Sequence, residues 1–198
     1  YRKKLGAELA KEKDIDADFV VPVPDSGVPA AIGYAEKSNK KFELGLIRNH
    51  YVGRTFIEPT QNIRSLGVKL KLNPTKTFVK NKTIILIDDS LVRGTTCYKI
   101  VRMLYESGAK KVHVRIACPE IKYPDFYGVD MPTKEELLAY NKNNEEMRNY
   151  IKAESLEFLS LDGLYNALIG EKRNSNYPQF SDHYFTGDYP IAPSDDLK

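Results

Sequence analysis

Short runs of apolar residues, each followed by small or charged residues, predict a series of buried strands. The clearest run is Ile84–Ile87, four consecutive apolar residues of the kind that form a strand buried on both faces. A similar run lies within residues 18–24, where Pro22 limits ladder hydrogen bonding and favours an irregular end. Shorter strands are predicted at 44–48, 112–118 and 156–159.

Apolar residues at helical spacing lie between these strands. They predict helices over 2–13, 28–35 and 99–107, a helix through Ile151 that Asn143 or Asn144 caps, and a helix that Asp162 caps and that ends near Gly170. Thr133 and Glu136 stand three residues apart before an apolar pair, a spacing that predicts a capping box. We interpret residues 1–170 as one domain and the polar residues 171–198 as an irregular C-terminal tail.

Residues 49 to about 80 follow neither period and contain several Gly and Pro breakers. Compact domains rarely keep a loop of this length unless it is a lid, a binding loop or a disordered segment. Residues 48–82 also hold eight Lys or Arg against Glu58 alone, a local charge of +7. This composition predicts a flexible loop that closes over an anionic ligand, and the alternative is an ordinary solvated loop.

Composition removes several classes of function. The 198 residues suffice for one sizeable domain, and the net charge of +3 is too small for a committed nucleic-acid binder. Cys97 and Cys118 show no pairing pattern, which favours a reducing compartment, and we expect the cytoplasm. No apolar run has transmembrane length and no signal peptide begins the chain, so no membrane partner is expected.

Two adjacent carboxylates, Asp88 and Asp89, follow the central strand, and the loop Ser90–Thr96 leads into a helix. In an open α/β sheet such a position lies where ligands bind, and a helix start offers free N–H groups to a phosphate. The carboxylates would repel a phosphate and suit a sugar diol or a magnesium ion instead. The stretch therefore predicts a ligand with both a ribose and a phosphate, and the alternative is a plain turn with solvated aspartates.

Asp25, Ser26 and Gly27 form a second turn between a predicted strand and a predicted helix. A turn with a small residue can bring backbone amides close to a diphosphate. By itself this signal favours a plain turn. Beside the aspartate pair, it becomes the expected pyrophosphate loop.

The stretch from Asp88 to Thr96 resembles the motif with which type I phosphoribosyltransferases bind phosphoribosyl pyrophosphate (PRPP). Residues 48–59, 108–112 and 123–132 resemble the amidophosphoribosyltransferase family, so the resemblance covers nearly the whole chain. It implies a type I phosphoribosyltransferase fold, α/β with a mostly parallel central sheet flanked by helices and a long flexible loop. The family has an N-terminal glutaminase domain, which we expect to be absent from this chain, and a C-terminal phosphoribosyltransferase domain, which the chain resembles.

The resemblance implies that ammonia joins PRPP to give 5-phosphoribosylamine and pyrophosphate. Tyr51, Arg54 and Lys71 are the implied catalytic residues of the flexible loop. The implied substrate-binding residues are Asp25, Ser26, Gly27, Asp88, Asp89, Ser90, Arg93, Gly94, Thr95 and Thr96. The implied cofactor is Mg²⁺, with Ser26, Gly27, Asp88 and Asp89 as candidate contacts. Relatives often carry a hydroxyl residue where Gly27 stands, so either Ser26 or backbone amides would make the pyrophosphate or metal contact.

Some family members carry an iron–sulfur cluster with cysteine ligands near the C-terminus. No cysteine follows Cys118, so we expect no such cluster. The expected partners are PRPP, ammonia, pyrophosphate, the glutaminase domain, the inhibitory purine nucleotides AMP and GMP, and further copies of the chain in a homo-oligomer. Two alternatives remain open: a phosphoribosyltransferase that uses a nucleobase, and a catalytically silent sensor of PRPP or nucleotides.

Overall fold

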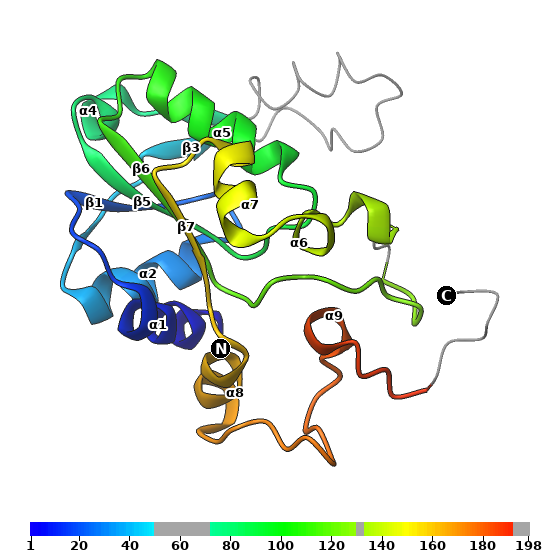
Figure 1. Ribbon diagram of the computed structural model, residues 1–198. Helices are drawn as coiled ribbons and strands as arrows, with labels where there is room; N and C mark the ends of the chain where they lie inside the picture. Colours follow the sequence, from blue (N-terminus) through cyan, green and yellow to red (C-terminus); the bar gives the residue numbers. More distant parts are fainter. Residues whose placement is uncertain (50–71, 130–132, 192–198) are drawn as a thin grey trace.

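The computed structural model describes residues 1–49, 72–129 and 133–191 of the chain. Its central sheet has five strands in the order β2-β1-β5-β6-β7, and all four neighbouring pairs are parallel (Figure 1). The strands are β1 (Phe19–Pro22), β2 (Lys41–Phe42), β5 (Thr83–Asp88), β6 (Lys111–Ile116) and β7 (Ser155–Phe158). The predicted fold class, α/β with a mostly parallel central sheet, is confirmed.

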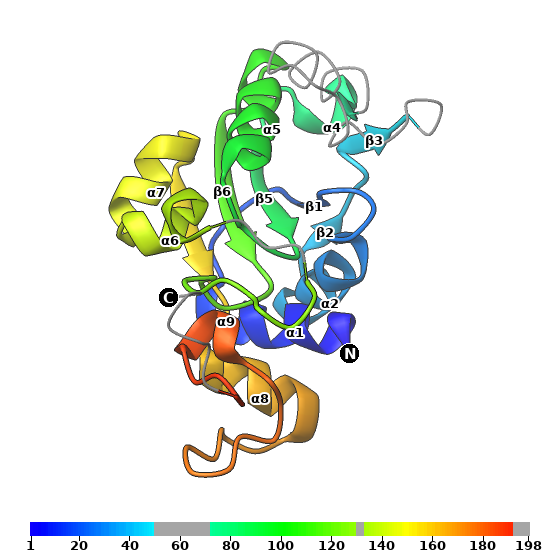
Figure 2. The same ribbon diagram turned by 90° about the vertical axis from the view of Figure 1, so that its right-hand side faces the viewer.

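Helices cover both faces of this sheet (Figure 2). On one face lie α1 (Arg2–Lys13) and α2 (Val28–Ser38), which pack closely against each other. On the other lie α5 (Thr95–Glu106) and α7 (Asn144–Ile151). Both faces of the central strand are buried, as the unbroken apolar run predicts.

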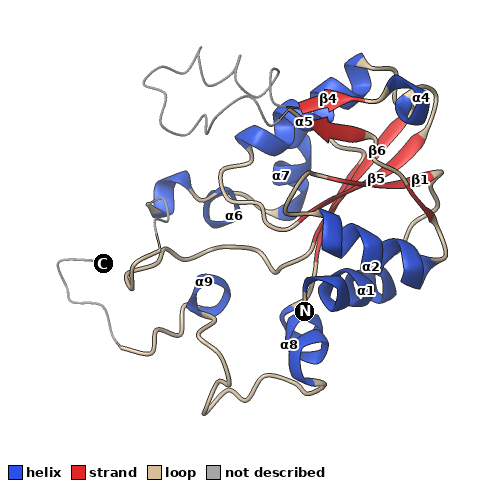
Figure 3. Cartoon of the chain, turned by 180° about the vertical axis from the view of Figure 1, so that it is seen from behind, coloured by secondary structure: helices blue, strands red, loops and turns tan. Residues whose placement is uncertain are grey.

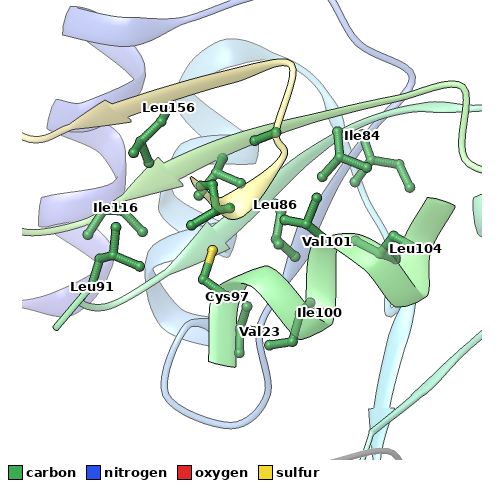
Figure 4. Packing of buried hydrophobic residues seen from close by; sticks show 14 of the residues in the cluster. Val23, Ile84, Leu86, Leu91, Cys97, Ile100, Val101, Leu104, Ile116 and Leu156 are labelled. Atoms are coloured by element: carbon green, nitrogen blue, oxygen red, sulfur yellow. The ribbon is translucent and has the colours of Figure 1, made fainter. Parts of the chain in front are cut away.

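The side chains of β5 alternate between two hydrophobic clusters. Ile84 and Leu86 pack beneath α5 with Ile100, Val101 and Leu104 (Figure 4). Ile85 and Ile87 face α1 and α2 with residues such as Leu9 and Tyr34. Because every one of these strand residues is fully buried, the strand cannot slip by one residue without exchanging its two faces.

The chain changes direction across the sheet between β1 and β5. After β1 it continues to β2 at one edge, and after β5 it continues to β6 and β7 toward the other. The neighbouring carboxyl ends of β1 and β5 therefore form the topological switch point, where open α/β sheets bind their ligands. Both predicted ligand-binding turns follow these two strands.

Part of the predicted flexible loop has regular structure. Leu72–Pro74 forms β4, which pairs antiparallel with β3 (Leu46–Arg48), and α4 (Lys76–Val79) follows it. Leu72 and Val79 are buried in the cluster beneath α5. The prediction of no helix or strand is therefore wrong for residues 72–79, whose short elements are held by packing with distant residues.

Two capping predictions are also wrong. Thr133 precedes the 3₁₀ helix η2 (Lys134–Glu136) without a side-chain cap, and Ser160, not Asp162, caps α8 (Leu161–Ile169). The predicted cap at Asn143 is confirmed, because its side chain accepts from the Glu146 N–H while the Glu146 carboxylate accepts from the Asn143 N–H. The short helix α6 (Leu138–Asn141) lies between η2 and α7.

The C-terminal segment is more ordered than the predicted irregular tail. It contains α9 (His183–Thr186), which lies beside the loop that follows β6 (Figure 3). The buried His183 ring shares a hydrogen bond of 2.7 Å with Asp125, and the Asp182 carboxylate accepts hydrogen bonds from Tyr165 and Arg173. No helix within the described residues is long and apolar enough to cross a membrane.

Candidate active site at the sheet's switch point

Asp88 and Asp89 lie at the carboxyl end of β5, as predicted. Asp88 is only 9% exposed, and its Oδ1 accepts a hydrogen bond of 2.9 Å from the N–H of Asp89. Burial, and then the neighbouring Asp89 charge, raise the pKa of Asp88 well above its ordinary value. The Asp89 side chain is more open, with about a third of its surface exposed. Burial and the neighbouring charge thus disfavour the ionised form of Asp88, and a bound cation or hydroxyl donors would stabilise that form.

The loop that follows Asp88 and Asp89 ends at the uncapped N-terminus of α5. Gly94 adopts the left-handed conformation with φ +74° and precedes α5, and no side chain caps the helix. The first helical hydrogen bond runs from Tyr98 N–H to the Gly94 carbonyl, so the first-turn N–H groups of Thr95 and Thr96 have no helical partner. Both threonines are exposed. A helix start of this kind binds anions, which agrees with the predicted phosphate site.

The Asp25–Gly27 turn is joined directly to the central strand. The Val23 N–H donates to the Ile87 carbonyl at 2.8 Å, and the Gly27 N–H donates to the Val23 carbonyl at 3.0 Å. A Cβ at Gly27 would lie 2.6 Å from the Ile87 carbonyl oxygen, so a side chain would fit there only if the backbone shifted. The Gly27 carbonyl accepts from the Ala31 N–H.

Both polar groups of Gly27 are thus engaged within the chain. The Gly27 N–H is therefore not available to pyrophosphate, and the residue lets the turn approach the end of β5 closely. The expected contact of Gly27 with the metal or pyrophosphate stays a prediction. Ser26, half-buried in the same turn, keeps its side chain available to a ligand.

Two arginines at the site were missed in the sequence analysis. Arg48, at the end of β3, places Nη1 2.6 Å from Asp25 Oδ2. Arg2, in the first turn of α1, donates to the Ser26 carbonyl at 3.3 Å and lies 3.9 Å from Asp89 Oδ2. Arg48 could have been suspected from its place beside the basic loop, whereas Arg2 carries no local signal.

The remaining predicted residues divide into two groups. Ser90 is half-buried directly after the acid pair, and Arg93 is exposed with its guanidinium bound to Glu136 of η2. Tyr51, Arg54 and Lys71 lie outside the described residues. The structure therefore brings together the two predicted ligand turns, and it leaves the predicted catalytic residues of the flexible loop untested.

The donor set at the switch point suits magnesium. Among the described residues, no group of three or more His, Cys, Asp or Glu side chains could hold a metal by itself. Mg²⁺ usually binds through one or two carboxylates, with water and substrate phosphates completing its coordination. Asp88 and Asp89 fit that pattern and would not retain the ion tightly without a ligand.

An all-parallel α/β sheet with an acid pair and an open helix start at its switch point agrees with the predicted type I phosphoribosyltransferase fold. No family model matches the chain. The chain is 59% identical over 190 residues to the amidophosphoribosyltransferase of Rhizobium etli, and the alignment covers 96% of this chain and 38% of that protein. It is 52% identical over 194 residues to the chloroplastic enzyme of Glycine max, covering 98% of this chain and 33% of that one.

The solved structures agree. The glutamine PRPP amidotransferase of B. subtilis, complexed with ADP and GMP, superposes with a TM-score of 0.88 at 47% identity, over all of this chain and 43% of that one. The chain is therefore similar over nearly its whole length to amidophosphoribosyltransferases, and it matches their phosphoribosyltransferase part. It spans about two fifths or less of the length of the curated relatives named above.

Proposed function

We propose that the chain catalyses the reaction of ammonia with PRPP, giving 5-phosphoribosylamine and pyrophosphate in the first committed step of purine synthesis. The carrying observation is that a buried acid pair at the end of β5 and the open start of α5 lie at the two ends of one short loop. A ligand with a diol at the acid pair and a phosphate at the helix start has the structure of ribose 5-phosphate. The similarity to amidophosphoribosyltransferases supports ammonia as the acceptor.

Asp88 and Asp89 hold the ribose hydroxyls in this proposal, directly or through Mg²⁺. The charge that burial makes unfavourable at Asp88 becomes favourable when a cation or hydroxyl donors reach it. Thr95 and Thr96 bind the 5-phosphate through backbone N–H groups and hydroxyls. When bound at the acid pair, Mg²⁺ would neutralise part of the negative charge on the pyrophosphate group.

The chemical step forms a bond between the ammonia nitrogen and ribose C1 while the bond from C1 to the pyrophosphate oxygen breaks. Pyrophosphate leaves with the electron pair, so stabilising its charge is the main demand on the protein. In this proposal Ser26 and the cations Arg48, Arg54 and Lys71 stabilise that charge. Neutral ammonia is already a nucleophile, so no general base is assigned.

Several further properties belong to this proposal. The complex of the B. subtilis relative with ADP and GMP supports competition of purine nucleotides such as AMP or GMP with PRPP here. In the complete protein a glutaminase part would supply the ammonia, and the assembly would be a homo-oligomer. The unpaired cysteines Cys97 and Cys118 support a reducing compartment such as the cytoplasm.

The decisive experiment measures Mg²⁺-dependent pyrophosphate release from PRPP with ammonia, adenine, uracil or no acceptor. We expect release with ammonia only, and its loss on chelation of the metal. The charge-neutral double variant Asp88→Asn with Asp89→Asn is the negative control. Release with a nucleobase would assign a different phosphoribosyltransferase, and binding of PRPP without any release would assign a sensor.

A further inference from the structure

Residues 133–151 pack against the outer side of residues 90–96, the loop proposed to bind the 5-phosphate. The Leu138 N–H of α6 donates to the Val92 carbonyl at 2.9 Å. A Cβ at Gly94 would lie 2.6 Å from the Leu138 side chain and 3.1 Å from the Tyr150 ring, so both residues lie directly over the loop. The loop therefore has a packed outer support that belongs to neither predicted ligand-binding turn.

An ion pair completes this support. The Arg93 Nε and Nη2 donate to Oε1 and Oε2 of Glu136, at 3.2 and 3.1 Å. The hydrogen bond from Arg93 lowers the pKa of Glu136, which keeps that carboxylate ionised. Two parallel hydrogen bonds occupy the edge of the guanidinium that would otherwise bind a phosphate in the same forked manner.

We propose that Glu136 is a positioning residue for the 5-phosphate site, acting through Arg93 to hold residues 92–94 so that the α5 start is open before ligand arrives. In this arrangement the Arg93 guanidinium ties the loop down and is not itself a phosphate ligand. The backbone donors of α5 supply the phosphate contacts. Holding a loop in its bound conformation raises affinity because less ordering remains to be done on binding. The inference rests on the proposed function only in taking the ligand to be a ribose 5-phosphate group.

The first test is Glu136→Gln, which removes the charge and keeps the shape. Calorimetric titration with ribose 5-phosphate should show affinity weakened about two- to fivefold, the range that a half-exposed pair supports. Affinity for pyrophosphate, which is expected at the Asp25–Gly27 turn, should not change. Hydrogen exchange over 90–96 without ligand should become faster.

A matched control is available on α5. Arg102 and Glu106 form an exposed pair at 2.6 Å that touches no ligand-binding turn. Glu106→Gln should leave the affinity for ribose 5-phosphate as in the wild type. An equal loss in Glu106→Gln and Glu136→Gln would overturn the proposal, because the effect would then be one of general surface charge.

The second test exchanges the charges, Arg93→Glu with Glu136→Arg. If the pair acts only as a tie, the exchange restores ribose 5-phosphate affinity above that of Glu136→Gln. If Arg93 contacts the phosphate, the exchange places an acid there and affinity falls more than tenfold, which overturns the proposal. Unchanged affinity in Glu136→Gln would overturn it as well.

The same measurements separate this inference from the proposed function. The function alone would be refuted if the wild type binds ribose 5-phosphate but releases no pyrophosphate with ammonia, while Glu136→Gln binds ribose 5-phosphate more weakly than the wild type. Chain that makes phosphoribosylamine while Glu136→Gln binds ribose 5-phosphate normally would refute the inference alone.

Discussion

Replacing Gly27 by Ala tests the contact that joins the pyrophosphate turn to the central strand. The new Cβ would meet the Ile87 carbonyl oxygen at 2.6 Å and the Val23 carbonyl oxygen at 2.8 Å, where ordinary contact begins at 3.4 Å. The turn and the end of β5 must therefore move apart by the difference between 3.4 and 2.6 Å, which is 0.8 Å. Both obstacles are backbone atoms, so no side-chain rotation relieves them.

Forced overpacking of this kind costs about 1–3 kcal/mol. For a chain of this size each kcal/mol lowers the melting temperature by roughly 2–4 °C, so we expect a fall of about 2–12 °C. The displaced Ile87 also directly precedes Asp88, so the acid pair moves relative to the turn. Since a misplacement near 1 Å can cost about 100-fold in rate, we expect pyrophosphate release to fall about 10- to 100-fold well below the melting temperature.

The control is Gly163→Ala in α8, which packs against α1 and where the new Cβ meets the side chains of Glu12 and Leu159. It should lower the melting temperature without a comparable loss of rate at 25 °C. A Gly27→Ala variant with wild-type melting and turnover would refute the reasoning. So would a Gly27→Ala rate loss no larger than that of Gly163→Ala.

Three further predictions concern the acid pair, the acceptor and the basic segment. Asp88→Asn with Asp89→Asn should abolish turnover and keep or raise thermal stability. The raised pKa of Asp88 means that the folded chain binds the extra proton, so wild-type stability relative to this variant should fall as pH rises above about 3.8. Near-normal turnover in the double variant would contradict the site. The purified chain should use ammonia and not glutamine, with rates that increase with pH as ammonium deprotonates; glutamine-dependent product would contradict this. Arg54→Ala should weaken PRPP use more than Arg64→Ala, and hydrogen exchange over 49–80 should slow with a non-reactive PRPP analogue. Equal protection with and without the analogue would show that the segment is not a lid.

The central strand and its two carboxylates could be found from sequence because their signals are local. An unbroken apolar run such as Ile84–Ile87 is compatible with few environments other than a doubly covered strand. The acids that follow it must then lie at the carboxyl edge. The N-cap at Asn143 was readable for the same reason, since its hydrogen bonds with Glu146 join residues three apart.

Contacts between distant residues explain the errors. Leu72–Pro74 is too short to show a period, and it becomes a strand only by pairing with Leu46–Arg48. Glu136 has the spacing of a cap, yet its carboxylate binds Arg93, 43 residues away. The predicted irregular tail contains the buried His183, whose ring shares a hydrogen bond with Asp125, 58 residues earlier in the chain.

The sequence by itself therefore determined the fold class and the identity of the acid pair and phosphate turn, because hydrophobic period and turn chemistry are properties of neighbouring residues. Tertiary structure alone decided what each of those residues can do. It closed Gly27 against the Ile87 carbonyl, placed Arg2 and Arg48 beside the turns, and bound Arg93 to Glu136. Each of these outcomes depends on the distance between segments that the parallel crossovers bring together, and such a distance leaves no pattern along the chain.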